Sequence, residues 1–208
     1  MAFPTTNAAT ELPAVNQILS SCGQAPVTTL DDTNPDVAIA YDTLLEVSRE
    51  VQAEGWSFNK ESHYPITTDN NKEYIIPSNV LQIDLTEDRV NRTKDVIRRN
   101  GKLYDKQNHT YEITSNAGDE IAADIVWFFD WVDLPAAIRD YITARAAAFT
   151  SNRIVGDSTQ IQILQQKEAY TRAMAVEYEC NQGDYSFFGT TSHTNPYSSY
   201  KPYQTLIR

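Results

Sequence analysis

Two stretches with the periodicity of α-helices are separated in this chain by a stretch with the periodicity of β-strands, and this order restricts the possible folds. Apolar residues recur at helical spacing over residues 11–55 and again over residues 134–181. Between them, apolar residues occupy every second position in residues 81–85 and 121–129, which is the period of half-buried strands. The sequence therefore predicts an α+β protein, a four-helix bundle with an inserted small antiparallel β-domain.

Capping residues, prolines and glycines place the ends of the four helices. Asn34 followed by Pro35 is the strongest start signal, because asparagine caps a helix and proline suits its first position. Thr10 is the corresponding candidate cap of the first helix, and Trp56 is expected to fold back onto the core after the second. The predicted helices span residues 11–22, 35–54, 134–155 and 158–181.

Asp157 or Ser158 is the candidate cap of the fourth helix, whose predicted core-facing residues include Leu164 and Met174. In the third helix, four alanines would permit the close approach of a neighbouring helix: Ala144, Ala146, Ala147 and Ala148.

The insert contains one clear hairpin signal. Asn100 and Gly101 separate two short segments, and this pair favours a type I′ turn because both turn positions need positive φ. A second turn at residues 106–109 would then place Tyr111 and Ile113 on a third strand. The predicted organisation is a helical bundle from residues 1–56 and 134–182, an inserted β-domain at 57–133, and an extended C-terminal arm at 183–208.

The predicted C-terminal arm is rich in aromatic residues and poor in charges. This composition is typical of the core of a protein–protein interface, whereas disordered tails contain few aromatic residues. We expect the arm to dock on a neighbouring protein, with packing on its own domain as the alternative. The candidate partner-binding residues of the arm are Tyr185, Phe187, Phe188, Tyr197, Tyr200 and Tyr203.

One concentration of basic residues lies within residues 89–106, although the whole chain has a formal net charge of −11. This acidic balance disfavours general binding to nucleic acid, which depends on lysine and arginine to displace counterions. A local basic cluster can still bind DNA or an acidic partner, but the acidic residues interspersed with it make a solvated surface the alternative. Arg98, Arg99 and Lys102 are the candidate partner-binding residues of this cluster.

The residues that carry most enzymatic chemistry are sparse or poorly spaced. The three histidines lack the spacing that places two imidazoles on one metal ion. With only seven glycines, the chain has neither a phosphate-binding loop nor a nucleophile-elbow motif. We therefore expect no catalytic residue, metal site or cofactor. A hydrolase acting on an envelope polymer through Asp130 and Asp133 is the alternative function.

The remaining sequence signals are expected absences. Cys22 and Cys180 lie at the ends of different predicted helices and provide no disulfide framework. The first residues of the chain lack the basic and apolar regions of a secretory signal. No window reaches the roughly 20 apolar residues that span a bilayer. We expect neither export by a signal peptide nor insertion into a membrane.

Five segments of the chain, in order and spacing, resemble the tail tubular protein A family, the gatekeeper adaptors of short-tailed podophages. No single segment is decisive, but their shared order is specific. The stretch after Gly183 is not part of the resemblance. The five segments are LPAVNQILSSCGQAPVTTL at residues 12–30, REVQAEGWSFN at 49–59, GKLYDKQNHTYEI at 101–113, DLPAAIRDYITARAAAFTSNRIVG at 133–156 and KEAYTRAMAVEYE at 167–179.

The resemblance implies a structural role in the virion tail, with the protein made in the host cytoplasm. It implies a dodecameric ring that joins the portal to the nozzle, tubular tail protein B, with tail fibres attached near the nozzle side. Genomic DNA would pass through this ring without sequence-specific binding. An acidic channel surface would repel the phosphate backbone during ejection, which is consistent with the negative charge of the chain.

Overall fold

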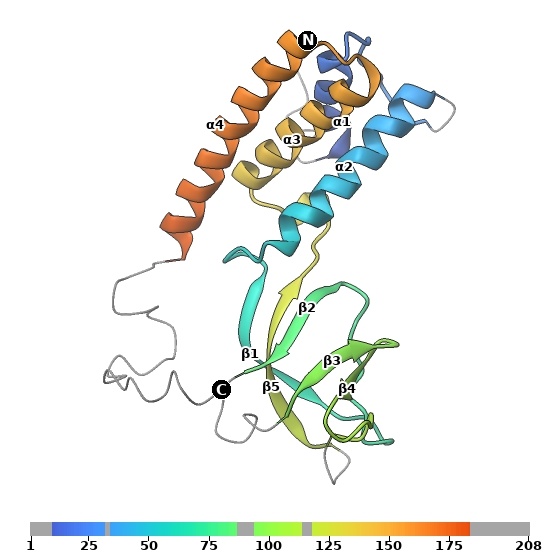
Figure 1. The fold of residues 1–208 in the computed structure, drawn as a ribbon, viewed down its shortest axis with the longest axis vertical. Coiled ribbons are helices and arrows are strands. Elements are labelled where there is room, and N and C mark those ends of the chain that lie inside the picture. Colours follow the sequence, from blue (N-terminus) through green and yellow to red (C-terminus); the bar gives the residue numbers. More distant parts are fainter. Residues whose placement is uncertain (1–9, 32–33, 87–93, 114–117, 184–208) are drawn as a thin grey trace. The chain divides into compact units, whose positions relative to one another are not determined.

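The computed structural model describes residues 10–31, 34–86, 94–113 and 118–183, and over these residues the chain is an α+β protein, as predicted (Figure 1). Its helices and small antiparallel sheets divide between two compact units. The helical unit comprises the described residues up to Glu54 together with Phe129–Gln182, and the β unit comprises Gly55–Phe128. The elements, in order, are α1 (Glu11–Ser21), α2 (Pro35–Ala53), β1 (Lys60–Thr67), β2 (Val80–Leu85), β3 (Val96–Arg99), β4 (Lys102–Asp105), β5 (Glu120–Trp127), the 3-10 turn η2 (Trp131–Asp133), α3 (Ala136–Ile154) and α4 (Ser158–Gln182).

The predicted helix caps lie at the expected positions, and two of the three make a side-chain capping hydrogen bond. Asn34 Oδ1 accepts a hydrogen bond of 3.0 Å from a backbone N–H in the first turn of α2. Asp157 Oδ1 accepts one of 3.0 Å from the backbone N–H of Thr159 at the start of α4. Thr10 occupies the predicted cap position of α1, which begins at Glu11, but its side chain makes no capping hydrogen bond. Its carbonyl oxygen instead accepts from the indole Nε1 of Trp131 at 3.2 Å.

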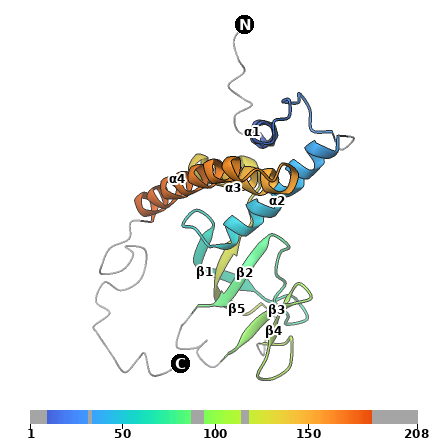
Figure 2. The same cartoon turned by 45° about the horizontal axis from the view of Figure 1, so that its top comes forward.

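Helix α3 is the central helix of the helical unit, because it packs against α1, α2 and α4. Its predicted small-residue surface is confirmed: Ala144 and the run Ala146, Ala147 and Ala148 are all buried. Small side chains let neighbouring helix backbones approach closely. Helices α1 and α2 also contact each other, whereas α4 has α3 as its main neighbour (Figure 2).

The β unit contains a three-stranded antiparallel sheet in the order β1-β5-β2 and a separate hairpin of β3 and β4. In the three-stranded sheet, Ile66 of β1 lies opposite Ile121 of β5, and Ile83 of β2 lies opposite Ile125. Apolar residues from both sheets and from residues 74–76 form one core, in which Tyr74 is fully buried. Burial of this shared core stabilises two sheets that are each too small to be stable alone.

The predicted hairpin is confirmed, but the third strand beyond it is wrong. Asn100 and Gly101 have φ values of 52° and 71°, as a type I′ turn requires. After β4, the carboxylate of Asp105 accepts hydrogen bonds from the backbone N–H groups of Gln107 and Asn108 at 2.7 and 3.2 Å. These bonds turn the chain so tightly that only isolated bridges follow, with no continuous strand over residues 110–113.

The chain leaves the helical unit after α2 and returns to it at Phe129, and a buried glutamine joins these two segments. Gln52, at the end of α2, is 0% exposed. Its Oε1 accepts from the backbone N–H of Phe129 at 2.8 Å, and its Nε2 donates to the carbonyl oxygen of Phe129 at 3.1 Å. Nε2 also lies 3.1 Å from Ser48 Oγ. One side chain thus holds both backbone polar groups of Phe129.

In the β unit, a buried asparagine similarly joins the segment before β1 to the end of β5. Asn59 is also 0% exposed, and its Nδ2 donates to the carbonyl oxygen of Trp127 at 2.8 Å. The backbone N–H of Trp127 donates to the carbonyl oxygen of Asn59, also at 2.8 Å. Asn59 Oδ1 accepts from the backbone N–H of Trp56 at 2.9 Å, and Trp56 is buried as predicted.

Candidate interaction surfaces

The three basic candidate residues lie together on the β3–β4 hairpin, and each contacts another group of the β unit. Arg98 Nη1 donates to the carbonyl oxygen of Val80. Lys102 forms an ion pair with Glu73, and this hydrogen bond raises the pKa of Lys102. The guanidinium of Arg99 lies 4.2 Å above the ring of Tyr104. Lys102 is therefore neutralised by a carboxylate, whereas the contacts of Arg98 and Arg99 leave their positive charges uncompensated among the described residues.

The exposed side of this hairpin adds an aromatic pair that sequence reasoning missed. The rings of Tyr104 and Tyr111 meet edge to face with centroids 5.0 Å apart, next to Arg99. A cation over an aromatic face is attracted by the quadrupole of the ring. The signal was present in the sequence, because Tyr104 lies in the predicted hairpin, but pairing with Tyr111 depends on the turn at Asp105.

Asp105 is the main structural carboxylate of the hairpin. It is 3% exposed, and burial alone would raise the pKa of its carboxyl group. Hydrogen bonds from the side chain and backbone of Asn108 and from the backbone of Gln107 outweigh burial, so the pKa of Asp105 is lowered. The folded turn therefore stabilises the ionised carboxylate of Asp105. A catalytic acid that donates its proton near neutral pH would need a raised pKa instead.

Helix α4 presents a second apolar face in addition to the one that packs on α3. Although the helix is 25 residues long, its only buried residues are Leu164 and Ala175. Ile163, Tyr170 and Met174 are 63%, 67% and 44% exposed. Their spacings of seven and four residues place them on one side of a helix. We call these three residues the α4 stripe.

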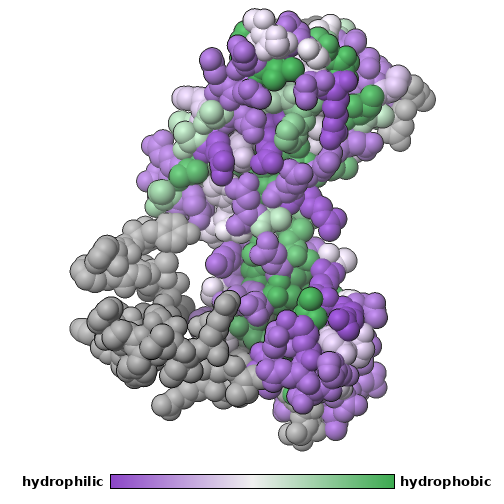
Figure 3. Space-filling view, viewed as in Figure 1, coloured by the Kyte–Doolittle hydropathy of each residue, from purple (hydrophilic) through white to green (hydrophobic). Residues whose placement is uncertain are grey.

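The sequence pattern of α4 did not separate these two faces. Met174 was assigned to the same face as Leu164, but the structure exposes Met174 and buries Ala175 in its place. Figure 3 shows hydrophobic side chains among hydrophilic ones on the α4 side of the helical unit. Ala175 is too small to give a strong periodicity signal, which explains the error.

Helix α2 carries an acidic outer face that is partly paired with arginines of α3. Arg145 lies 2.9 Å from Glu50, and Arg153 lies 3.1 Å from Glu46. The guanidinium of Arg145 is partly buried, but the hydrogen bond to Tyr141 and the nearby glutamate still raise its pKa. Two of the acidic residues on α2 are therefore compensated within the helical unit.

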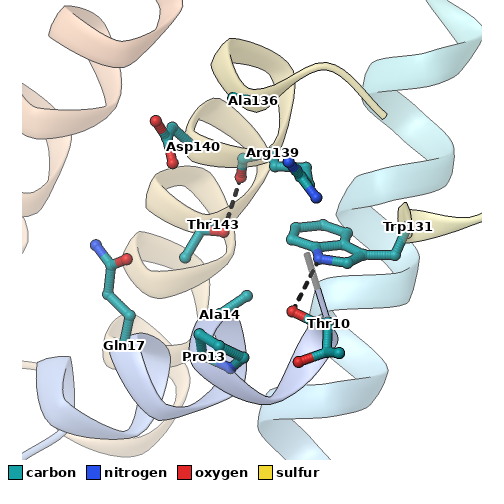
Figure 4. Close-up of a pocket in the computed structure, with 9 residues that line it drawn as sticks. All are labelled: Thr10, Pro13, Ala14, Gln17, Trp131, Ala136, Arg139, Asp140 and Thr143. Atoms are coloured by element: carbon teal, nitrogen blue, oxygen red, sulfur yellow. Dashed lines mark hydrogen bonds between the residues drawn. The ribbon is translucent and has the colours of Figure 1, made fainter. Parts of the chain in front are cut away.

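A pocket of about 260 Å³ opens on the helical unit between the first two turns of α1 and the first two turns of α3 (Figure 4). Its floor contains the buried residues Ala14, Trp131 and Thr143. The half-buried side chain of Arg139 closes one end. Exposed residues of both helices, including Asp140, form the rim.

The two carboxylates of the alternative hydrolase, Asp130 and Asp133, lie on either side of a short 3-10 turn. Asp130 precedes the 3-10 turn η2, and Asp133 ends it, with the Asp133 backbone N–H donating to the Asp130 carbonyl oxygen at 3.0 Å. Within residues 10–31, 34–86, 94–113 and 118–183, no three histidine, cysteine or acidic side chains converge to hold a metal ion. Both cysteines are free thiols, and burial raises the pKa of Cys22.

The family model described as "Tail tubular protein" matches residues 12–185 of the chain. This match covers the helical unit and the β unit alike.

The chain belongs to the podophage tail tubular protein family.

Tail tubular proteins are structural proteins of the virion tail, so this family member is a component of the phage tail with a structural role. No curated protein matches the chain. In the described part of this tail tubular protein, no helix has both the length and the apolar character needed to cross a bilayer. The aromatic candidates Tyr185, Phe187, Phe188, Tyr197, Tyr200 and Tyr203 lie outside the described residues.

Proposed function

We propose that this tail tubular protein is a ring-forming adaptor that joins the portal to the tail nozzle and surrounds the DNA ejection channel. The family match and the five-segment resemblance to gatekeeper adaptors support this role. In this proposal the four helices act as one bundle, residues 1–56 with 134–182, and residues 57–133 form an inserted domain that faces the nozzle and fibres. A ring of twelve copies is the assembly that the resemblance implies.

The observation that carries the proposal is the α4 stripe. A monomeric soluble protein rarely leaves three large apolar side chains on one helix face exposed without a function. Ring closure needs a heterologous contact that repeats around an axis, in which one surface of each copy meets a different surface of the next. Burial of the remaining exposed surface of Ile163, Tyr170 and Met174 would contribute at most about 1–2 kcal/mol per residue to such a contact, because each side chain is already partly covered in the monomer. In this proposal the stripe is the apolar centre of one lateral interface.

Assembly of the full chain with portal protein of the same phage tests the proposal. Negative-stain electron microscopy should show rings on the portal, with their stoichiometry read directly. Tyr170→Asp should weaken lateral assembly by at least tenfold in mass photometry, because a charge would replace a 67% exposed aromatic residue at the contact. The matched control is Gln165→Asp, an exposed position on a different side of α4. Normal rings in Tyr170→Asp would exclude α4 as the lateral contact.

The C-terminal arm, residues 183–208, is proposed to dock on a neighbouring tail protein through its aromatic residues. Deletion of residues 184–208 should leave the monomer folded by circular dichroism but prevent stable assembly. A truncated chain that assembles normally would remove this arm from the interface. Arg98, Arg99 and Lys102 are proposed as secondary docking residues, because the Arg99–Tyr104 pair lies at the surface of the hairpin.

We further propose that the channel surface of the ring is acidic and lets DNA pass without binding. The net charge of −11 supports this proposal, whereas the ion pairs on α2 reduce the charge available there. A filter-binding salt series with duplex DNA separates this role from a DNA-binding module. Salt-sensitive binding that requires Arg98 and Arg99 would favour the DNA-binding module instead.

A further inference from the structure

The pocket between α1 and α3 contains a cationic group that has no anionic partner in the part of the chain that the structure describes. Arg139 Nη1 is buried and makes no hydrogen bond to any described residue. None of the ion pairs among the described residues involves Arg139, whereas Arg145 and Arg153 of the same helix each contact a glutamate. A guanidinium nitrogen that is removed from water without an acceptor bears the full cost of its lost hydration. An acceptor brought by a ligand would remove this cost.

The arrangement of the side chains determines where such an acceptor can bind. In Figure 4 the guanidinium of Arg139 extends toward Trp131, and the carboxylate of Asp140 lies on the opposite side of Arg139's backbone. The indole of Trp131 is held in place by its hydrogen bond to the carbonyl oxygen of Thr10, at 3.2 Å. An incoming anion therefore fits at the Trp131 end of the pocket and is repelled at the Asp140 end.

The size of the pocket limits what it can hold. Pockets for drug-sized molecules and cofactors usually measure about 300–1,000 Å³, and this one measures about 260 Å³. The buried surfaces of Ala14 and Trp131 are suited to contact a short aliphatic chain. The planar guanidinium fork matches the geometry of a carboxylate. A carboxylate on one or two methylene groups satisfies all three conditions.

We propose that this pocket binds the acidic side chain of a partner polypeptide, an aspartate or glutamate that pairs with Arg139 and packs against Trp131. The site is distinct from the α4 stripe and does not depend on ring formation. It provides the helical unit with a contact whose specificity comes from charge and shape, whereas the α4 stripe is apolar. An acidic residue on a surface loop or helix of a tail protein could reach this pocket because its rim is exposed.

Titration of the full-length chain with a blocked glutamate tests this proposal directly. The probe is N-acetyl-glutamic acid α-amide, and the matched neutral probe is N-acetyl-glutamine α-amide. The readout is the indole N–H signal of Trp131 in ¹H–¹⁵N spectra, assigned with the variant Trp131→Phe. The glutamate probe should shift this signal saturably and bind at least tenfold more tightly than the glutamine probe, since hydrogen bonds to charged groups exceed neutral ones by about that factor.

Variants of the two charged residues separate pocket binding from general attraction. Arg139→Gln should abolish the preference for glutamate, and Arg139→Lys should reduce it several-fold, because lysine lacks the bidentate fork. Asp140→Asn should strengthen glutamate binding, because it removes a like charge from the rim. The control is Arg153→Gln, which changes an exposed arginine far along the same helix and should leave the preference unchanged.

The results have clear interpretations. Equal binding of the two probes, or a glutamate preference that persists in Arg139→Gln, would overturn the proposal. Acetate that binds as tightly as the glutamate probe would also overturn it, because the pocket would then be a general anion site with no role for the side-chain methylene groups. If Arg139→Gln does not fold, weaker binding in Arg139→Lys together with tighter binding in Asp140→Asn supports the assignment, and no change in either variant contradicts it.

Discussion

Replacement of Gln52 by leucine should destabilise the helical unit by about 3 kcal/mol. Leucine has a similar size but removes three hydrogen bonds: two to the backbone of Phe129, at 2.8 and 3.1 Å, and one to Ser48 Oγ at 3.1 Å. Each bond contributes about 1 kcal/mol, and a buried backbone group that loses its partner costs about 1–3 kcal/mol. The apolar leucine side chain offsets part of this loss, because Gln52 is completely buried.

Urea unfolding followed by circular dichroism at 222 nm measures this loss, because the helices are in the unit that contains Gln52. The matched control is Gln162→Leu at an exposed position of α4, which should change the free energy of unfolding by less than about 0.5 kcal/mol. A loss below about 1 kcal/mol in Gln52→Leu, or an equal loss in both variants, would show that Gln52 does not hold Phe129 in the manner described.

Two further predictions concern the β unit. The lowered pKa of Asp105 means that its ionised form stabilises the folded state above the ordinary aspartate pKa of about 3.9, and that this stabilisation is lost as the pH falls through the lower folded-state value. The difference in unfolding free energy between the native chain and Asp105→Asn should therefore shrink between pH 6 and pH 3 in urea titrations followed by tryptophan fluorescence. Gly101→Ala should cost about 1 kcal/mol in the same assay, because Gly101 has φ of 71° and a Cβ there meets no atom within 4 Å, so only backbone strain acts. Gly101→Asn should cost less, since asparagine tolerates this conformation, and equal costs would contradict the strain argument.

The features that sequence predicted correctly are those set by local interactions. Asn34 caps α2 through a group two residues away, and Asn100 with Gly101 determines the hairpin turn by its own backbone preference. The alanine run of α3 was also assigned correctly, because a helix with many small residues must meet close neighbours.

Features that depend on contacts between residues far apart in the chain were not predicted from the sequence. Strand β1 has only one buried residue, so alternation could not reveal it, and it forms only by pairing with β5 some 60 residues later. The pocket could not be predicted either, because it requires Trp131 to reach the carbonyl oxygen of Thr10, 121 residues away. The burial of Ala175 and exposure of Met174 likewise depend on how α4 lies on α3.

The paired backbone contacts at Phe129 and Trp127 have a consequence for how such tail proteins can change over time. Gln52 joins the ends of the helical unit with its own atoms, and Asn59 joins the ends of the β unit in the same way. Each unit therefore holds together its own two chain ends at the junction. The entropy lost in bringing those ends together is offset by hydrogen bonds within the same unit. Recombination between residues 52 and 59 and between 127 and 129 could exchange the whole β unit between phages, with new partner specificity and an unchanged helical scaffold.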